Sequence, residues 1–302
     1  MPQPRNGVVL KAIERARLLV GKVSLPNVVV GATAAALVGG VVSVLWLATG
    51  QAEGLPLFFR YPGTLTVIAL NLAGLVLSMV ARRQFSRGEP MRLVWSVLAV
   101  AAACSLTSGV LSQVAGENWR RARLILGGPV QTVLLALGLA LALGIYRQSG
   151  IRSRPRIPDW LLMVVVAGFC GWEIYDESLL QAPGSPLSFQ QAVSLVNDPL
   201  LSLLLIEAIL IRRSALKMGR GLIARCWGAF TAGIFLTFVG DIAVWISGHS
   251  PLPVPLTATT WYLWFLASGA YALAPACQVE ACRRAGSSLA APLSGRSAIP
   301  AA

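Results

Sequence analysis

The feature that most limits the fold of this chain is a series of long apolar runs separated by clusters of basic residues. A helix that crosses a membrane needs roughly 20 apolar residues. Only 12% of the residues are charged and 56% are hydrophobic, which excludes an ordinary soluble domain. The pattern predicts an all-α, polytopic membrane protein with eight transmembrane helices, at residues 27–49, 63–81, 93–114, 124–146, 160–179, 199–211, 227–246 and 257–277.

The sixth apolar run is the weakest of the eight. Its uncharged core is short, and Glu207 interrupts it. An extension back to Gln191 restores the length of a span. We therefore expect the sixth helix to begin well before Pro199.

The basic residues indicate the orientation of these helices. Of the 25 Lys and Arg residues, 21 fall in the N-terminal segment, in three alternate connections and in the C-terminal tail. Loops rich in Lys and Arg remain on the cytoplasmic side. This predicts a multi-pass protein of the plasma (inner) membrane with both termini in the cytoplasm. The remaining four basic residues are Arg60, Arg120, Arg121 and Arg123, which are expected outside.

Membrane topology also explains the net charge of +13. Eight of the nine tryptophans lie near the expected ends of spans, as aromatic residues do at membrane interfaces, and the exception is Trp172. The charge therefore needs no nucleic-acid partner. The expected partners are membrane lipids and a protein that contacts the basic cytoplasmic loops.

Composition divides the chain into four parts. Residues 1–26 form a cytoplasmic N-terminal segment with an amphipathic helix, for which a cleaved signal peptide is the alternative, and residues 283–302 form a disordered cytoplasmic tail. Between them lie two four-helix membrane halves, 27–147 and 148–282. In each half one helix ends in an Arg pair and the next opens with a Trp, at Trp95 and at Trp227. This similarity predicts a parallel 4+4 repeat, which occurs in transporters and in sensors that arose by duplication.

The acidic residues within the expected spans all lie in the second half. Each costs about 2.5–3.5 kcal/mol at the middle of a membrane helix, so such residues are candidates for function. Glu173 and Asp241 are both expected roughly 20 Å above the inner surface. With Trp172, Tyr175 and Trp245 they predict an outward-facing acidic and aromatic pocket for a cation or an amine. The alternative is that both acids are protonated and structural.

Two further acids have specific interpretations. Glu207 is the deepest acid and a candidate proton or cation relay, whereas its alternative is an ion pair with Arg212 five residues later. Asp198 directly precedes Pro199. That order is typical of a helix N-cap followed by proline in the first turn, so a structural cap is expected there.

Several other kinds of site are disfavoured. The single histidine, His249, lies in an expected outer loop, so a metal centre built on histidines is not expected. The five cysteines form no CxxC motif, and no nucleophile with a neighbouring base is visible. We therefore expect no metal, no cofactor and no enzymatic activity. A membrane enzyme that acts on lipid is the weakest alternative.

One segment of the second half carries a resemblance to a known group of proteins. Gly240-Asp241 and Trp245 are followed by a loop with Pro251 and Pro253, and then by 261–264 and 272–274. This segment resembles the multi-helix sensory regions of bacterial diguanylate cyclases and histidine kinases. Because only about 20 residues follow Cys282, the resemblance implies a stand-alone sensor that passes its signal to a partner.

The sequence thus predicts a non-enzymatic membrane sensor or membrane-complex subunit. The alternative is a proton- or cation-coupled secondary transporter that uses the intramembrane acids. The 4+4 repeat favours the transporter, and the expected absence of broken central helices weighs against it.

Overall fold

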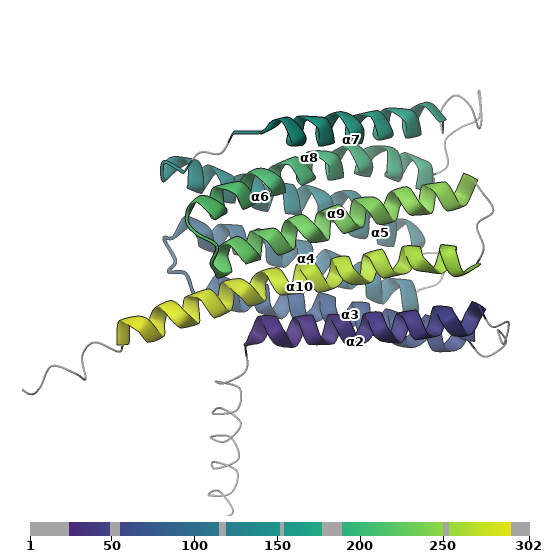
Figure 1. Ribbon diagram of the computed structural model, residues 1–302, viewed down its shortest axis with the longest axis horizontal. Helices are drawn as coiled ribbons and strands as arrows, with labels where there is room; N and C mark the ends of the chain where they lie inside the picture. Colours follow the sequence, from purple (N-terminus) through teal and green to yellow (C-terminus); the bar gives the residue numbers. More distant parts are fainter. Residues whose placement is uncertain are drawn as a thin grey trace, which may run out of the picture.

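A computed structural model describes residues 24–48, 55–114, 119–151, 154–176, 189–249 and 254–290. Its helices lie side by side in one bundle (Figure 1). They are α2 (Leu25–Ala48), α3 (Leu55–Arg83), α4 (Pro90–Val114), α5 (Arg120–Ile125), η3 (Leu126–Val130), α6 (Gln131–Gln148), α7 (Ile157–Tyr175), α8 (Phe189–Lys217), α9 (Leu222–His249) and α10 (Val254–Ala290). The all-α fold predicted from the sequence is confirmed, and no strand occurs in these ranges.

Several of these helices have the dimensions of membrane spans. Within the described residues, five are long and apolar enough to cross a membrane, at Leu65–Arg83, Pro90–Ser112, Arg120–Gln148, Ala192–Lys217 and Leu222–Ala243. This agrees with a multi-pass membrane protein. The count of eight spans stays a prediction.

Six helices form a closed ring of neighbours. In order around the ring they are α3, α4, α6, α8, α9 and α10, and α10 returns to contact α3. Helix α2 packs outside the ring against α3 and α10, and α7 packs outside it against α8. Figure 1 shows α7 and α2 on opposite sides of the bundle.

An aromatic cluster joins the two halves of the chain within this ring. Trp95 of α4 and Trp227 of α9 are fully buried, and their rings stack with centroids 6.3 Å apart. Phe230 lies 5.7 Å from Trp227. The Trp227 indole N–H donates a hydrogen bond of 2.9 Å to the Tyr146 hydroxyl, which satisfies a polar group that would otherwise be buried alone.

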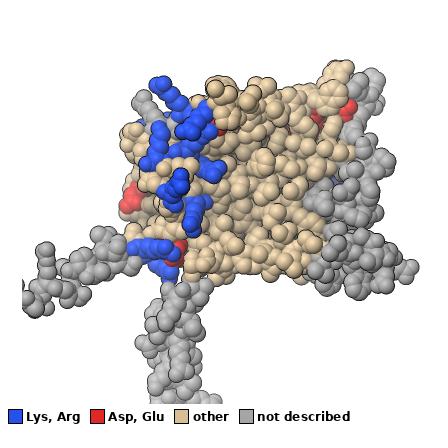
Figure 2. All heavy atoms as spheres, in the orientation of Figure 1, with Lys and Arg blue, Asp and Glu red and all other residues tan. Residues whose placement is uncertain are grey.

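Basic side chains gather in a band at one end of the bundle, and the rest of the visible described surface is almost free of charge (Figure 2). At this end Asp159 accepts a hydrogen bond of 2.7 Å from the backbone N–H of Arg156, which caps the start of α7. Asp159 is buried and also forms an ion pair with Arg213 of α8. This contact ties the peripheral helix α7 to the ring.

The structure corrects the interpretation of Asp198 and Pro199. Helix α8 begins at Phe189 and continues through both residues, so Asp198 is not an N-cap and Pro199 is not in a first turn. Proline removes one backbone N–H from a helix. Membrane helices tolerate this because neighbouring groups satisfy the freed carbonyl.

The two ends of the chain are only partly described. Residues 1–23, which include the expected N-terminal amphipathic segment, and residues 291–302 of the tail lie outside the described ranges. Helix α10 continues to Ala290 and therefore includes the first part of the segment expected to be disordered.

Candidate functional site

Three acidic side chains from three helices approach one another away from the basic end of the bundle. They are Glu173 of α7, Asp198 of α8 and Asp241 of α9, here called the acidic cluster. Glu173 and Asp198 are each only 6% exposed. Asp198 lies nineteen residues before the end of α8 at Lys217, or roughly 28 Å along the helix. The cluster is therefore buried and far from the basic band.

The closest contact within the acidic cluster joins two carboxyl groups. The side chains of Glu173 and Asp198 are in hydrogen-bonding contact. Two ionised carboxylates repel each other at this range, and a hydrogen bond between two carboxyl groups requires that one of them carries a proton. Asp241 lies close enough to Asp198 for the two charges to interact.

The indole of Trp264 holds the third acid in place. Its N–H, the only donor of the side chain, hydrogen-bonds to Asp241 across the interface between α10 and α9. This approach depends on Gly240, because a Cβ at that position would lie 2.6 Å from Trp264 Nε1. The Gly240-Asp241 pair of the sequence therefore combines an acid with the space for its donor.

Helix α8 connects the acidic cluster to a break in the neighbouring helix. Asn197 donates to Asp198 Oδ1 at 3.5 Å and accepts a hydrogen bond of 2.8 Å from Thr132. Thr132 is the second residue of α6. The preceding element, η3, leaves the helical conformation at Gly128 (φ −107°, ψ −108°), and Pro129 follows. The expectation that the central helices are unbroken is therefore wrong for the fourth span.

The side of the cluster toward the basic end is closed by packed side chains of α7, α8 and α9. Phe169, one turn before Glu173, contacts Phe238, which precedes Asp241 on α9, with ring centroids 5.9 Å apart. The Cys170 thiol lies 3.2 Å from the Ser202 hydroxyl, which donates to the backbone carbonyl of Asp198 at 2.8 Å.

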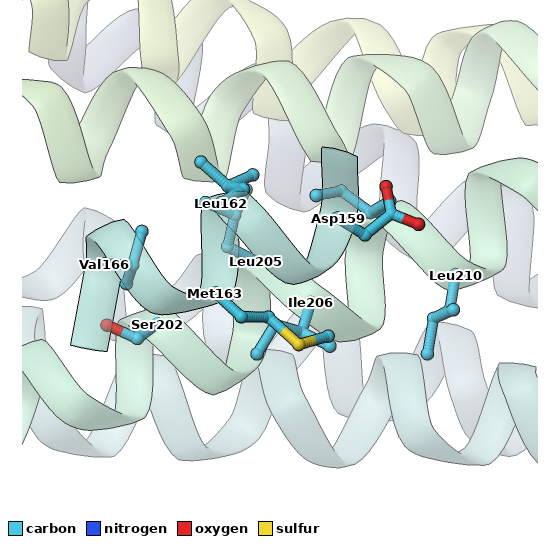
Figure 3. Close-up of a pocket in the computed structure, with 9 residues that line it drawn as sticks. Asp159, Leu162, Met163, Val166, Ser202, Leu205, Ile206 and Leu210 are labelled. Carbon is cyan, nitrogen blue, oxygen red and sulfur yellow. The ribbon is translucent and has the colours of Figure 1, made fainter. Parts of the chain in front are cut away.

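A narrow apolar crevice runs between α7 and α8 below this point (Figure 3). Asp159 lies at one end of the crevice and Ser202 near the other, with Leu162, Met163 and Ile206 among the residues between them. The lining offers little polar surface apart from these two residues. The crevice therefore separates the acidic cluster from the ion pair of Asp159 with Arg213.

The other residues expected at the site lie elsewhere. Trp172 and Tyr175 are 51% and 45% exposed and contact each other on the outer face of α7, so they do not join the buried Glu173. Glu207 lies nine residues from Asp198 and forms no ion pair with Arg212 in the described part of the chain, so the pairing considered for it is absent. One of its carboxylate oxygens is buried without a hydrogen-bond partner there.

Sequence reasoning missed the contributions of Asp198, Asn197, Thr132 and Trp264. The order Asp198-Pro199 resembles a helix start, and this pattern concealed an acid that contacts Glu173 and lies near Asp241. The stretch Gly127-Gly128-Pro129 was the available sign of the helix break.

Among the described residues no group of three or more His, Cys, Asp or Glu side chains is arranged to hold a metal ion. No protein-family model, curated protein or solved structure gives a significant match to this chain.

Proposed function

We propose that this protein is a proton- or cation-coupled membrane transporter. The observation that carries the proposal is the contact between the Glu173 and Asp198 carboxyl groups inside the bundle. A buried pair of this kind exchanges one bound proton for one cation, which is the elementary step of coupled transport. The helix break at Gly128 adds support, because transporters place their ion sites at discontinuous helices.

We further propose that the chain crosses the plasma membrane eight times as a parallel 4+4 repeat, with both termini in the cytoplasm. The contacts support a two-fold relation: α3 with α4 parallels α8 with α9, and α4 with α6 parallels α9 with α10. Under this relation Trp95 corresponds to Trp227, and these residues stack on each other. The basic band supports the orientation.

The test is proton flux into proteoliposomes that contain a pH-sensitive dye, driven by a membrane potential. We expect flux from the wild type, and flux at the level of empty liposomes from Glu173→Gln, Asp198→Asn and Asp241→Asn. Glu89→Gln is the matched control, because Glu89 is an exposed acid in the α3–α4 connection and should leave flux unchanged. Wild-type liposomes that behave as empty ones, or full flux in Asp198→Asn, would contradict the proposal.

The second candidate is the membrane sensor or complex subunit, in which the same acidic cluster binds a cation without transport. The basic band favours it, because such a surface suits anionic lipids or an acidic protein partner. Resemblance to bacterial sensory regions is a further reason to keep it. A sensor should show a saturable change of tryptophan fluorescence on cation binding, with no flux. Asp241→Asn should remove the change, because it removes a carboxylate charge that would bind the cation next to Trp264.

A further inference from the structure

A second polar site lies inside the helix ring, on the cytoplasmic side of the acidic cluster. It is a cavity between α3, α4, α6, α9 and α10, here called the inner cavity, with a volume of about 30 Å³ available to water. That is room for about two water molecules. Its polar lining residues are Asn71, Ser78, Ser105, Gln131 and Tyr271.

Among the described residues, four of the five polar side chains that line the inner cavity have no side-chain hydrogen-bond partner; the fifth, Tyr271, contacts Thr237. Asn71 is 9% exposed and Ser78 is 3% exposed. Neither they nor Ser105 and Gln131 form a side-chain hydrogen bond to another residue in the described ranges. An amide or hydroxyl buried without a hydrogen bond costs roughly 1–3 kcal/mol, and bound water removes that cost. These polar side chains, in a lining that is otherwise apolar, favour bound water over an empty cavity.

The inner cavity extends from the cytoplasmic end toward the middle of the ring. On α3, Ser78 lies five residues from the terminal Arg83, or roughly 7.5 Å along the helix. Asn71 lies twelve residues from Arg83, or roughly 18 Å. The inner cavity thus lies between these two depths, part of the way from the basic band to the centre of the bundle.

Two hydroxyl groups lead from the inner cavity to the acidic cluster. The Tyr271 hydroxyl lies 3.3 Å from Thr237 Oγ1 on α9. Asp241 is one helical turn beyond Thr237, and Asp241 is close enough to Tyr271 for an electrostatic interaction. The other ionisable groups around Asp241 are Asp198 of α8 and, through Asp198, Glu173 of α7. Polar groups therefore follow one another from the cavity to the acids.

We propose that the inner cavity holds water and is the route by which protons pass between the cytoplasm and the acidic cluster; this inference rests on the proposed function. A proton from cavity water binds the Tyr271 oxygen as that hydroxyl releases its own proton to Thr237. The Thr237 hydroxyl donates to the Gly233 carbonyl at 3.0 Å, and it rotates from there to release its proton to the Asp241 carboxylate. Each oxygen gains one proton and loses one, and the two hydroxyls end unchanged.

Radiolytic hydroxyl labelling with mass spectrometry tests the water directly, whatever the protein transports. We expect oxidation of Tyr271 in the wild type and a several-fold slower oxidation in the double variant Asn71→Leu, Ser105→Val. Tyr146 is the matched control, because its hydroxyl accepts from Trp227 and it does not line the cavity. Size-exclusion chromatography verifies that the variant is folded. No oxidation of Tyr271 in the wild type would overturn the hydrated cavity.

The flux assay tests the route separately from the function. Tyr271→Phe and Thr237→Val each remove one hydroxyl while nearly keeping the shape, and we expect both to slow wild-type proton flux at least several-fold. Wild-type flux in both variants, together with loss of flux in Asp198→Asn, would overturn the route and leave the proposed function standing. Absence of flux in the wild type would overturn both.

Discussion

Substitution of Gly240 by alanine tests how the acidic cluster is held. The new Cβ would lie 2.6 Å from Trp264 Nε1 and 2.8 Å from its Cδ1, whereas ordinary contacts begin at 3.4 Å. The indole must therefore move by about 0.8 Å or rotate away from Asp241. Overpacking of this kind costs about 1–3 kcal/mol, and loss of a hydrogen bond to a charged group costs about 1.5–3 kcal/mol.

Because the two effects overlap, we expect Gly240→Ala to lower the free energy of unfolding by about 2–4 kcal/mol. The assay is equilibrium unfolding in mixed dodecyl maltoside and SDS micelles, followed by far-UV circular dichroism. Gly171→Ala is the control, because a Cβ there meets nothing within 4 Å. It should be neutral or stabilise α7 by up to about 1 kcal/mol through helix propensity.

A double-mutant cycle identifies Trp264 as the cause. The second substitution is Trp264→Phe, which makes the side chain smaller and removes its N–H. Gly240→Ala should then lower the unfolding free energy by less in this background, with an interaction energy of at least about 1 kcal/mol. Equal stability of Gly240→Ala and the wild type, or an interaction energy of zero, would refute the reasoning.

Two further predictions concern the basic end of the bundle. Asp159→Asn should destabilise the docking of α7 by about 1.5–3 kcal/mol, because Arg213 loses a buried charged partner. Amide hydrogen exchange of α7 measures the effect, and unchanged protection of α7 would contradict the prediction. At the end of α10, beyond the predicted span, the hydrogen bond from Arg283, aided by Arg284, holds the pKa of Glu280 below its usual range despite burial. A lowered pKa stabilises the fold at pH values above the unfolded pKa of about 4.3. This stabilisation is lost as the pH falls through the folded pKa. The Glu280→Gln variant should thus be less stable than the wild type at pH 7 and should approach wild-type stability in acid. A difference in unfolding free energy that does not change with pH, measured in urea or SDS, would contradict the prediction.

The helix break changes the balance between the two functional hypotheses. From the sequence alone, the expected absence of broken central helices made a transporter less favoured. The discontinuity at Gly128 lies beside Asn197, whose neighbour Asp198 belongs to the acidic cluster. A helix that is already interrupted next to the acids can change shape when their charge changes, and this is why transport is the first proposal.

The sequence by itself determined the all-α class, the positions of the apolar segments and the side on which basic residues gather. These properties depend on local hydrophobicity and charge along the chain, which need no knowledge of neighbours. It also identified Glu173 and Asp241 as acids worth attention, because an acid in an apolar run is costly wherever the helix packs.

Only the tertiary structure decided which acids meet. Asp198 joins Glu173 because α8 continues through Pro199 and packs between α7 and α9, and the sequence order alone suggested a cap. Trp172 is adjacent to Glu173 in sequence yet lies on the outer face, because successive residues of a helix point in directions about 100° apart. Contacts between helices depend on which faces pack together, and that choice is made by the whole ring rather than by any one segment.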